Sequence, residues 1–184
     1  MSVTAARGFR AAGVRAGLKA SGKPDLALVV NDGPLDTAAG VFTTNRVVAA
    51  PVVWSRRLLT GQEGGRPGHA RAVVLNSGSA NACTGAQGLR DTEATAARAA
   101  GLVSIEPDQV LVCSTGVDVA ALALADTPQA GTDAATAIMT TDTVSKEDAL
   151  TVGAGEQSWT IGGMIKGVGM LAPGLATMLA VITT

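Results

Sequence analysis

Glycine interrupts this chain so often that no long regular element is expected. The 184 residues include 23 glycines, and short runs rich in Val, Ile and Leu lie between them. Because glycine weakens the interior of a helix or strand, this spacing favours many short elements joined by turns. The longest apolar stretch, residues 168–182, is broken by Gly169, Pro173 and Gly174 and is too short for a bilayer-spanning helix of roughly 20 residues. We therefore expect a globular chain without a membrane span.

Apolar runs and turn residues predict a single domain of mixed α/β type over residues 1–184. The expected strands are residues 26–31, 41–44, 50–55, 72–76 and 109–114. Alanine-rich segments with capping residues predict helices over residues 91–101, 117–125 and 133–139. A hairpin around residues 153–157 and a buried central strand over residues 178–182 complete the set. Because strands and helices alternate without an internal repeat, the sequence predicts layered α/β packing.

Composition argues against several kinds of binding protein. The formal net charge of −1, the absence of Tyr and an aromatic content of 2% disfavour binding to nucleic acid. One histidine, His69, and two cysteines, Cys83 and Cys113, do not supply the usual zinc cage. We therefore expect no nucleic-acid partner, no metal and no cofactor, and we interpret both cysteines as small buried residues. No export signal precedes the first elements, so we expect a cytoplasmic protein.

The Gly-rich run near residue 170 carries the densest signal for chemistry. Gly167, Gly169 and Ala172 match the dinucleotide-binding pattern G-x-G-x-x-A, but Pro173 would break the helix that has to follow it. Thr177 offers another interpretation. A threonine freed at a chain terminus uses its own α-amine as the base and needs no histidine. A plain Gly-rich turn that enters an apolar strand fits the same residues, so the pattern alone leaves the alternatives open.

A resemblance narrows the choice. The run K-G-V-G-M-L-A-P-G-L-A-T-M-L, residues 166–179, resembles the self-cleavage motif of the ornithine acetyltransferase family. These N-terminal-nucleophile enzymes of arginine synthesis are also called glutamate N-acetyltransferases. Further stretches resemble the same family in the same order: residues 7–9 with 12–14, 76–85, 113–116 and 137–143. The matches extend over nearly the whole chain, so the resemblance implies the α chain of a precursor about twice as long.

The resemblance also implies roles for individual residues. Thr177 matches the nucleophile that is exposed when the precursor cuts itself between Ala176 and Thr177. Thr115 and Gly116 match the pair that forms the oxyanion hole, and a hydroxyl beside a backbone N–H suits that task. Because the chain continues past the expected cut, we expect the bond between Ala176 and Thr177 to be intact here.

Substrate binding is implied for Thr140, Lys166 and Thr177, with Thr141 as the neighbouring option. A lysine flanked by glycine suits a carboxylate partner, although a solvated surface lysine is the commoner case. The implied reaction moves an acetyl group from N2-acetylornithine to glutamate through an acyl-Thr177 ester, and some members also use acetyl-CoA. The implied fold is a layered α/β sandwich, and the implied partner is a β chain in an assembly of two α and two β chains.

Other functions stay open at this point. A self-cleaved threonine can pass its acyl group to water, as in an amidohydrolase or aminopeptidase, and a paralogue can serve a specialised pathway. A chain without a competent partner would be an inert subunit. Two departures from the family pattern bear on this choice: the second half of the precursor is absent, and the segment between Thr115 and Thr140 is shorter than expected.

Overall fold

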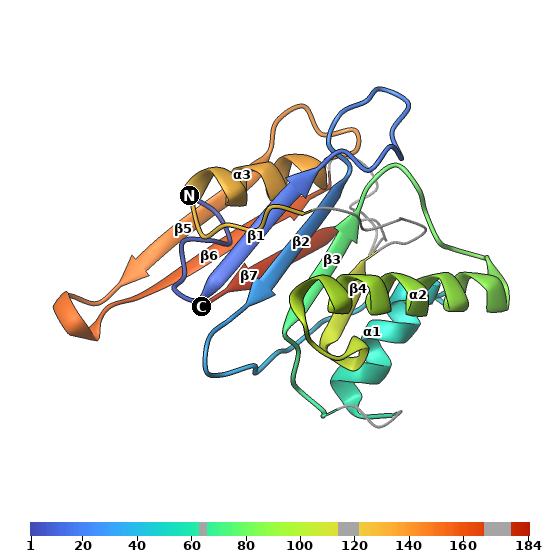
Figure 1. The fold of residues 1–184 in the computed structure, drawn as a ribbon, viewed down its shortest axis with the longest axis horizontal. Helices are drawn as coiled ribbons and strands as arrows, with labels where there is room; N and C mark the ends of the chain where they lie inside the picture. The colour runs from blue at the N-terminus through green and yellow to red at the C-terminus, as the bar shows by residue number, and fades with distance from the viewer. Residues whose placement is uncertain (63–65, 114–121, 168–177) are drawn as a thin grey trace.

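The structure is a computed structural model that describes residues 1–62, 66–113, 122–167 and 178–184. Its elements form layers around two sheets (Figure 1). The main sheet, in the order β1-β2-β3-β4, consists of β1 (Phe9–Val14), β2 (Leu26–Asn31), β3 (Ala72–Asn76) and β4 (Val110–Cys113). The second sheet, in the order β5-β6-β7, consists of β5 (Lys146–Val152), β6 (Trp159–Lys166) and β7 (Leu179–Thr183). The helices are α1 (Ala50–Thr60), α2 (Gly85–Val103) and α3 (Pro128–Ala137), with short 3-10 turns at Pro107–Gln109 and Gly155–Gln157.

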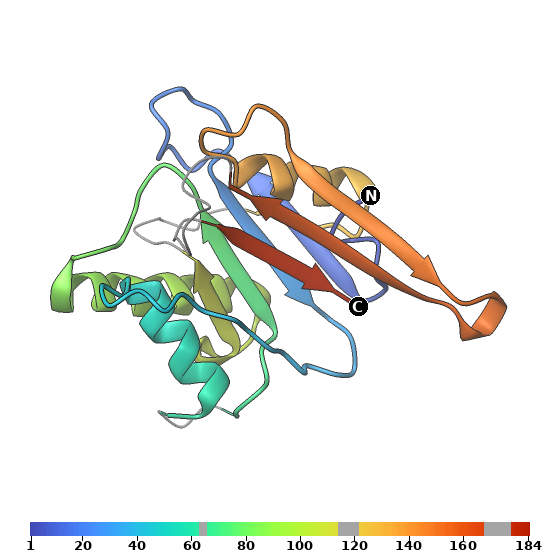
Figure 2. The ribbon, with the colours of Figure 1, turned by 180° about the vertical axis from the view of Figure 1, so that it is seen from behind.

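Strand β2 is buried on both faces because alternate side chains enter two different cores. Leu28 and Val30 face a core that is closed by the alanines of α2. Ala27 and Val29 face a second core that α3 and Met164 of β6 close from the other side. Figure 2 shows the second sheet lying across that side of the main sheet. The mixed, layered α/β fold predicted from the sequence is therefore confirmed.

Close backbone contact fixes α3 on strand β1. A Cβ built on Gly13 would lie 1.9 Å from the carbonyl oxygen of Asp133, so only glycine allows this approach. The helix begins after Thr127, whose hydroxyl accepts a hydrogen bond from the backbone N–H of Ala130 at 3.3 Å, and Pro128 occupies its first turn. It spans residues 128–137 instead of the predicted 133–139 because these capping residues define its start.

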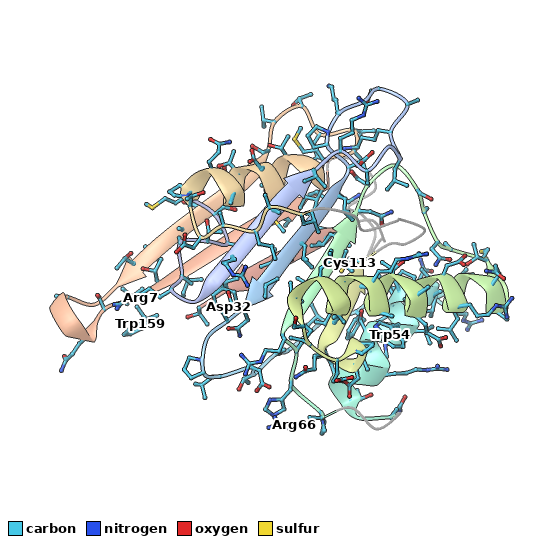
Figure 3. All side chains as sticks on the ribbon, in the orientation of Figure 1. Arg7, Asp32, Trp54, Arg66, Cys113 and Trp159 are labelled. Carbon is cyan, nitrogen blue, oxygen red and sulfur yellow. The ribbon has the colours of Figure 1, made fainter. Side chains whose placement is uncertain are left out.

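Helix α1 replaces the strand that we predicted over residues 50–55. Pro51 lacks a backbone N–H, but in the first turn of a helix that N–H would have no partner within the helix. Gly61 ends the helix in a left-handed conformation at φ 74°. Trp54 Nε1 donates to the Val110 carbonyl at 2.9 Å, and the Ser55 hydroxyl bonds both the N–H and the carbonyl of Val112 at 2.9 Å. The helix thus satisfies the open edge of β4, which a short apolar run does not reveal. Figure 3 labels Trp54, which lies on α1.

Other expectations were met in part. The strands predicted over residues 26–31, 72–76 and 109–114, and the hairpin around residues 153–157, are present, whereas residues 41–44 form no strand. Helix α2 begins at Gly85, six residues before the predicted start, and ends at Val103, two residues past the predicted stop, where Ser104 caps it in the left-handed region. Residues 122–125 are not helical and instead make a bridge from Ala125 to Ala11 of β1. The rest of the predicted helix over residues 117–125 lies outside the described residues.

Strand β7 is present as predicted, but it is not a buried central strand. It pairs only with β6 among the described strands and lies at the end of the three-stranded order. Ile182 is 74% exposed, while Leu179, Val181 and Thr183 turn toward the protein. Exposure therefore alternates along β7, although its sequence is a continuous apolar run. In the described part of the chain, no helix combines the length and the apolar character that crossing a membrane requires.

Candidate functional site

The structure brings together two of the predicted site residues. Lys166 ends β6, Thr140 lies in the loop after α3, and Lys166 Nζ donates to the Thr140 hydroxyl at 3.4 Å. Both threonines are exposed, but the side-chain hydrogen bond of Lys166 is with Thr140, so the geometry favours Thr140 over Thr141. Thr115, Gly116, Ala176 and Thr177 lie outside the described residues, as does the expected intact bond between Ala176 and Thr177. Their assigned roles stay predictions.

Lys166 is buried, contrary to what is common for a lysine. Along β6, Gly162, Met164 and Lys166 alternate toward the protein interior, and Lys166 is only 4% exposed. Burial lowers the pKa of Lys166, and the nearby Asp142 carboxylate opposes this effect. An ammonium in this position gains most from an anionic partner, because bulk water is largely excluded.

Asp142 lies beside this pair and links the two segments that carry it. Its Oδ2 accepts the backbone N–H of Thr140 at 3.3 Å, and its Oδ1 accepts that of Gly167 at 3.2 Å. Lys146 of β5 forms an ion pair with the same carboxylate and also donates to the Gly167 carbonyl at 3.3 Å. Burial by itself would raise the pKa of Asp142, but these hydrogen bonds outweigh it and hold the pKa at about 2. The carboxylate is therefore ionised throughout the physiological range.

The end of α3, just before the loop that holds Thr140, lies against the carboxyl ends of the parallel strands β3 and β4. Ser77, which follows β3, donates its hydroxyl to the carbonyl of Ala137 at 2.5 Å. Lys19 donates to the same carbonyl at 3.4 Å and to that of Pro24 at 2.7 Å. Because β3 and β4 are parallel, the end of β4 at Cys113 lies at this same edge. In the sequence, residues 115 and 116 come after Cys113 with one residue, Ser114, between them.

The two cysteines differ in their surroundings. Burial raises the pKa of the Cys113 thiol to about 11, so this residue is protonated and a poor nucleophile. Cys83, in contrast, is exposed and has a left-handed backbone at φ 59°. The interpretation of Cys83 as a buried residue was therefore wrong, because the loop before α2 turns it outward.

Asn81 stabilises the N-terminal part of α2 through its side-chain amide. Its side-chain amide donates to the Gly88 carbonyl at 2.8 Å and to the Thr92 hydroxyl at 3.3 Å, and Thr84 bonds its side-chain oxygen. These contacts hold the first turns of α2, in keeping with a structural loop over residues 76–85. The cavity of about 650 Å³ between residues 38–45 and α1 shares no lining residue with the pair of Lys166 and Thr140.

Sequence reasoning missed Asp142 and Lys146. Asp142 lies within the stretch 137–143 that resembles the family, and this was its only signal. Neither residue belongs to a pattern that predicts burial, since an Asp between two threonines is usually solvated. Within the described ranges, no group of three or more His, Cys, Asp or Glu residues could hold a metal ion.

Comparison with known proteins extends these observations. The family model described as ArgJ family matches residues 10–184. The arginine biosynthesis bifunctional protein ArgJ of Bifidobacterium longum is 56% identical over 199 residues, which cover 100% of this chain and 49% of that protein. The protein of the same description in Streptomyces coelicolor is 54% identical over 198 residues and is covered to 49%. The chain thus spans about half the length of the curated relatives that it matches.

Solved structures show the same likeness. A crystal structure of ornithine acetyltransferase complexed with ornithine, from Mycobacterium tuberculosis, matches with a TM-score of 0.81 and 50% identity, covering 95% of this chain and 96% of that chain. The arginine biosynthesis bifunctional protein of Bacillus halodurans matches with a TM-score of 0.81 and 34% identity, covering 97% and 95% of the two chains. The first curated alignment is longer than the 184 residues of this chain, so that relative carries residues that are lacking here.

Proposed function

Because the chain belongs to the ArgJ family, we propose that it is the N-terminal half of a glutamate N-acetyltransferase of arginine biosynthesis. The observation that carries the proposal is the meeting of buried Lys166 with the Thr140 hydroxyl, two residues that the resemblance had assigned to substrate. An ammonium and a hydroxyl side by side suit the α-carboxylate that both acetylornithine and glutamate present. The ornithine held in the similar crystal structure is a ligand of this kind.

The proposed reaction has two half-reactions at Thr177. The Thr177 hydroxyl attacks the acetyl carbonyl of N2-acetylornithine while the free α-amine of the same residue takes the hydroxyl proton. The C–N bond then breaks, the proton passes to the leaving amine, and ornithine departs from an acetyl-Thr177 ester. The amine of glutamate attacks this ester, which releases N-acetylglutamate and restores the hydroxyl. Thr115 and Gly116 would donate hydrogen bonds to the oxyanion of each tetrahedral intermediate.

Self-cleavage between Ala176 and Thr177 is the step that would create the free amine. Before the cut, the Thr177 nitrogen is an amide and cannot act as a base, so the uncut chain is expected to be inactive. After the cut, β7 would belong to the second chain. Two features support continued association: β7 pairs along its length with β6, and the Thr183 hydroxyl donates to the Val3 carbonyl at 2.8 Å.

The rest of the partner would come from the half of the relatives that this chain does not span. The outward face of the second sheet supports this part of the proposal (Figure 2), because it presents the exposed apolar side chains of Leu150, Ile161, Ile165 and Ile182. Such a face is typical of a protein interface. We propose that the C-terminal half covers it and that two copies of each half assemble. Use of acetyl-CoA as a second acetyl donor and a cytoplasmic location are parts of the same proposal.

The test follows the acetyl group. The complete protein, with its C-terminal half, is incubated with acetyl-labelled N2-acetylornithine in the presence and absence of glutamate, and the products are identified by mass spectrometry. We expect label in N-acetylglutamate, and a Lys166→Met variant with a strongly raised KM for acetylornithine. Lys23→Met is the matched control, because Lys23 is an exposed lysine of the same chain. Label that appears only in acetate would indicate the amidohydrolase instead and contradict the transferase.

A further inference from the structure

Asp142 combines burial with hydrogen bonds to its own loop, at Thr140, and to the distant end of β6, at Gly167. Its side chain is 1% exposed, yet it is charged. One carboxylate oxygen meets the N–H of Thr140 and the other meets the N–H of Gly167, which are 27 positions apart in the sequence. These two backbone groups belong to Thr140 itself and to the residue next to Lys166. The carboxylate thus lies between the two elements that bring the pair together.

We propose that Asp142 is a positioning residue, which holds the loop after α3 and the end of β6 at the separation that lets Thr140 and Lys166 bind one substrate carboxylate. This inference rests on the proposed function and adds to it a residue that does not touch the substrate. A fixed separation matters because the hydroxyl and the ammonium have to meet the same two oxygens. A displacement of about 1 Å in such a site can reduce the rate by roughly 100-fold.

Comparison with another buried aspartate shows why this role is specific. Asp25 is also fully buried and accepts three backbone N–H groups, from Ala16, Leu18 and Lys19. All three belong to the single loop that precedes it, so Asp25 stabilises local structure. Asp142 instead joins two separate elements, and Lys146 neutralises it. Since Lys146 pairs with Asp142, Lys166 has the Thr140 hydroxyl as its hydrogen-bond partner in the described part of the chain.

Substitution of Asp142 by Asn tests the proposal in the complete protein. An amide has one oxygen and one NH2 group, so it can accept only one of the two backbone N–H groups and repels the other. We expect Asp142→Asn to lower kcat/KM for acetylornithine by about 10- to 100-fold, chiefly through KM. Asp108→Asn is the matched control, because Asp108 is an exposed aspartate in the 3-10 turn Pro107–Gln109, away from the second sheet. It is expected to stay within about twofold of the wild type.

A double-mutant cycle distinguishes positioning from general damage. If Asp142 acts through Lys166, the Asp142→Asn change will add no more than about threefold once Lys166→Met is present. A full and multiplicative loss in that background, or a wild-type KM for Asp142→Asn alone, would overturn the proposal. If Asp142→Asn does not fold, the same cycle is run with Asp142→Glu, which keeps the charge but moves both oxygens by one methylene. A wild-type KM for that variant would overturn the proposal as well.

Failure of this inference can be told apart from failure of the proposed function. A wild-type protein that transfers no acetyl group contradicts the function, whatever the variants do. A second readout does not need activity: amide hydrogen exchange at Thr140 or at Gly167, whichever loses its acceptor, is expected to become at least tenfold faster in Asp142→Asn, with α2 unchanged. Unchanged exchange at both amides would refute the linking role of Asp142 even if the enzyme is active.

Discussion

At the scale of single residues, two buried charges of opposite sign lie close together but take different partners. Asp142 pairs with Lys146 and two backbone N–H groups, while Lys166 contacts a hydroxyl. Burial lowers the pKa of Lys166, whereas hydrogen bonding holds that of Asp142 at about 2. The two charges differ in their partners: Asp142 accepts hydrogen bonds from donors within the fold, whereas Lys166 donates to a neutral hydroxyl, which is why we propose that it binds an anionic substrate group.

The pKa of Asp142 predicts how stability depends on pH. A carboxylate whose pKa lies below its ordinary value of 3.8 stabilises the folded state above that pH, and this contribution disappears as the pH falls toward 2. We expect Asp142→Asn to be less stable than the wild type at pH 6, and the gap to narrow between pH 4 and pH 2. Urea unfolding of both complete proteins across this range measures it. A gap that stays constant down to pH 2 would show that the charge of Asp142 does not stabilise the fold.

The two thiols are expected to react at very different rates. Cys83 is exposed, whereas burial raises the pKa of Cys113 to about 11. Because the thiolate is the reactive form, a maleimide at pH 8 should label Cys83 promptly and the partly buried Cys113 much more slowly. Peptide mass spectrometry assigns the label, and Cys83→Ser is expected to remove the fast phase of native labelling. Native labelling of Cys113 at the rate of Cys83 would contradict the assigned burial.

At the scale of elements, sequence predicted strands better than helices. The runs that form β2, β3 and β4 are short and continuously apolar, because β2 and most of β3 are buried on both faces and β4 alternates between buried and partly buried residues. The sequence predicts a strand where α1 forms, because the contacts that stabilise this helix are made with a distant element. Trp54 and Ser55 hydrogen-bond the edge of β4. Such a contact between distant elements leaves no local pattern. The capping residues Thr127 and Pro128 of α3 were visible, but alanine density drew the predicted helix farther along the chain.

The packing of α3 on β1 predicts a large effect for one glycine. An added methyl at Gly13 would meet the Asp133 carbonyl oxygen at 1.9 Å, so the helix would have to move. We expect Gly13→Ala to destabilise the protein by roughly 1–3 kcal/mol or more. Gly101→Ala is the control, since its Cβ would meet nothing within 4 Å and glycine weakens a helix by about 0.5–1 kcal/mol.

Denaturant unfolding measures both variants. The expected signs are opposite, with Gly13→Ala less stable and Gly101→Ala equally or more stable than the wild type. Equal stability of Gly13→Ala and the wild type would mean that α3 does not approach β1 as closely as the structure places it.

At the scale of the whole molecule, the outward face of the second sheet is where we expect the proposed C-terminal half to bind. Leu150 on β5 is 63% exposed and lies opposite Ile161 of β6 in the register of the two strands. We expect Leu150→Asp to weaken association of the two chains, because burying an unpaired carboxylate in an apolar interface is strongly unfavourable. Co-purification of the cleaved chains followed by size-exclusion chromatography measures the effect.

Leu102→Asp serves as the control for this change. Leu102 is an exposed leucine on α2, on the other side of the main sheet. We expect it to leave association unchanged. Loss of association with Leu102→Asp but not with Leu150→Asp would place the interface elsewhere on the molecule.

The sequence predicted the family, because short motifs in a fixed order are specific even when each is weak. The resemblance also singled out Thr140 and Lys166, which the structure places in contact, and their role in substrate binding stays a prediction. It did not predict that Lys166 is buried or that Asp142 joins its two segments. Both facts depend on how β6 packs against the loop after α3, and that packing arises only in the folded chain. Thr115 and Thr177 stay predictions, since they lie outside the described residues.

The central claim is that Thr177 carries the acetyl group at the start of a second chain. The most direct test is the intact mass of each chain of the complete protein after brief mixing with N2-acetylornithine without glutamate. The account predicts a chain that begins Thr-Met-Leu, heavier by one acetyl group, which returns to its original mass when glutamate is added. A protein that transfers acetyl groups while the Ala176–Thr177 bond stays intact, or with the acetyl group on another residue, would contradict it.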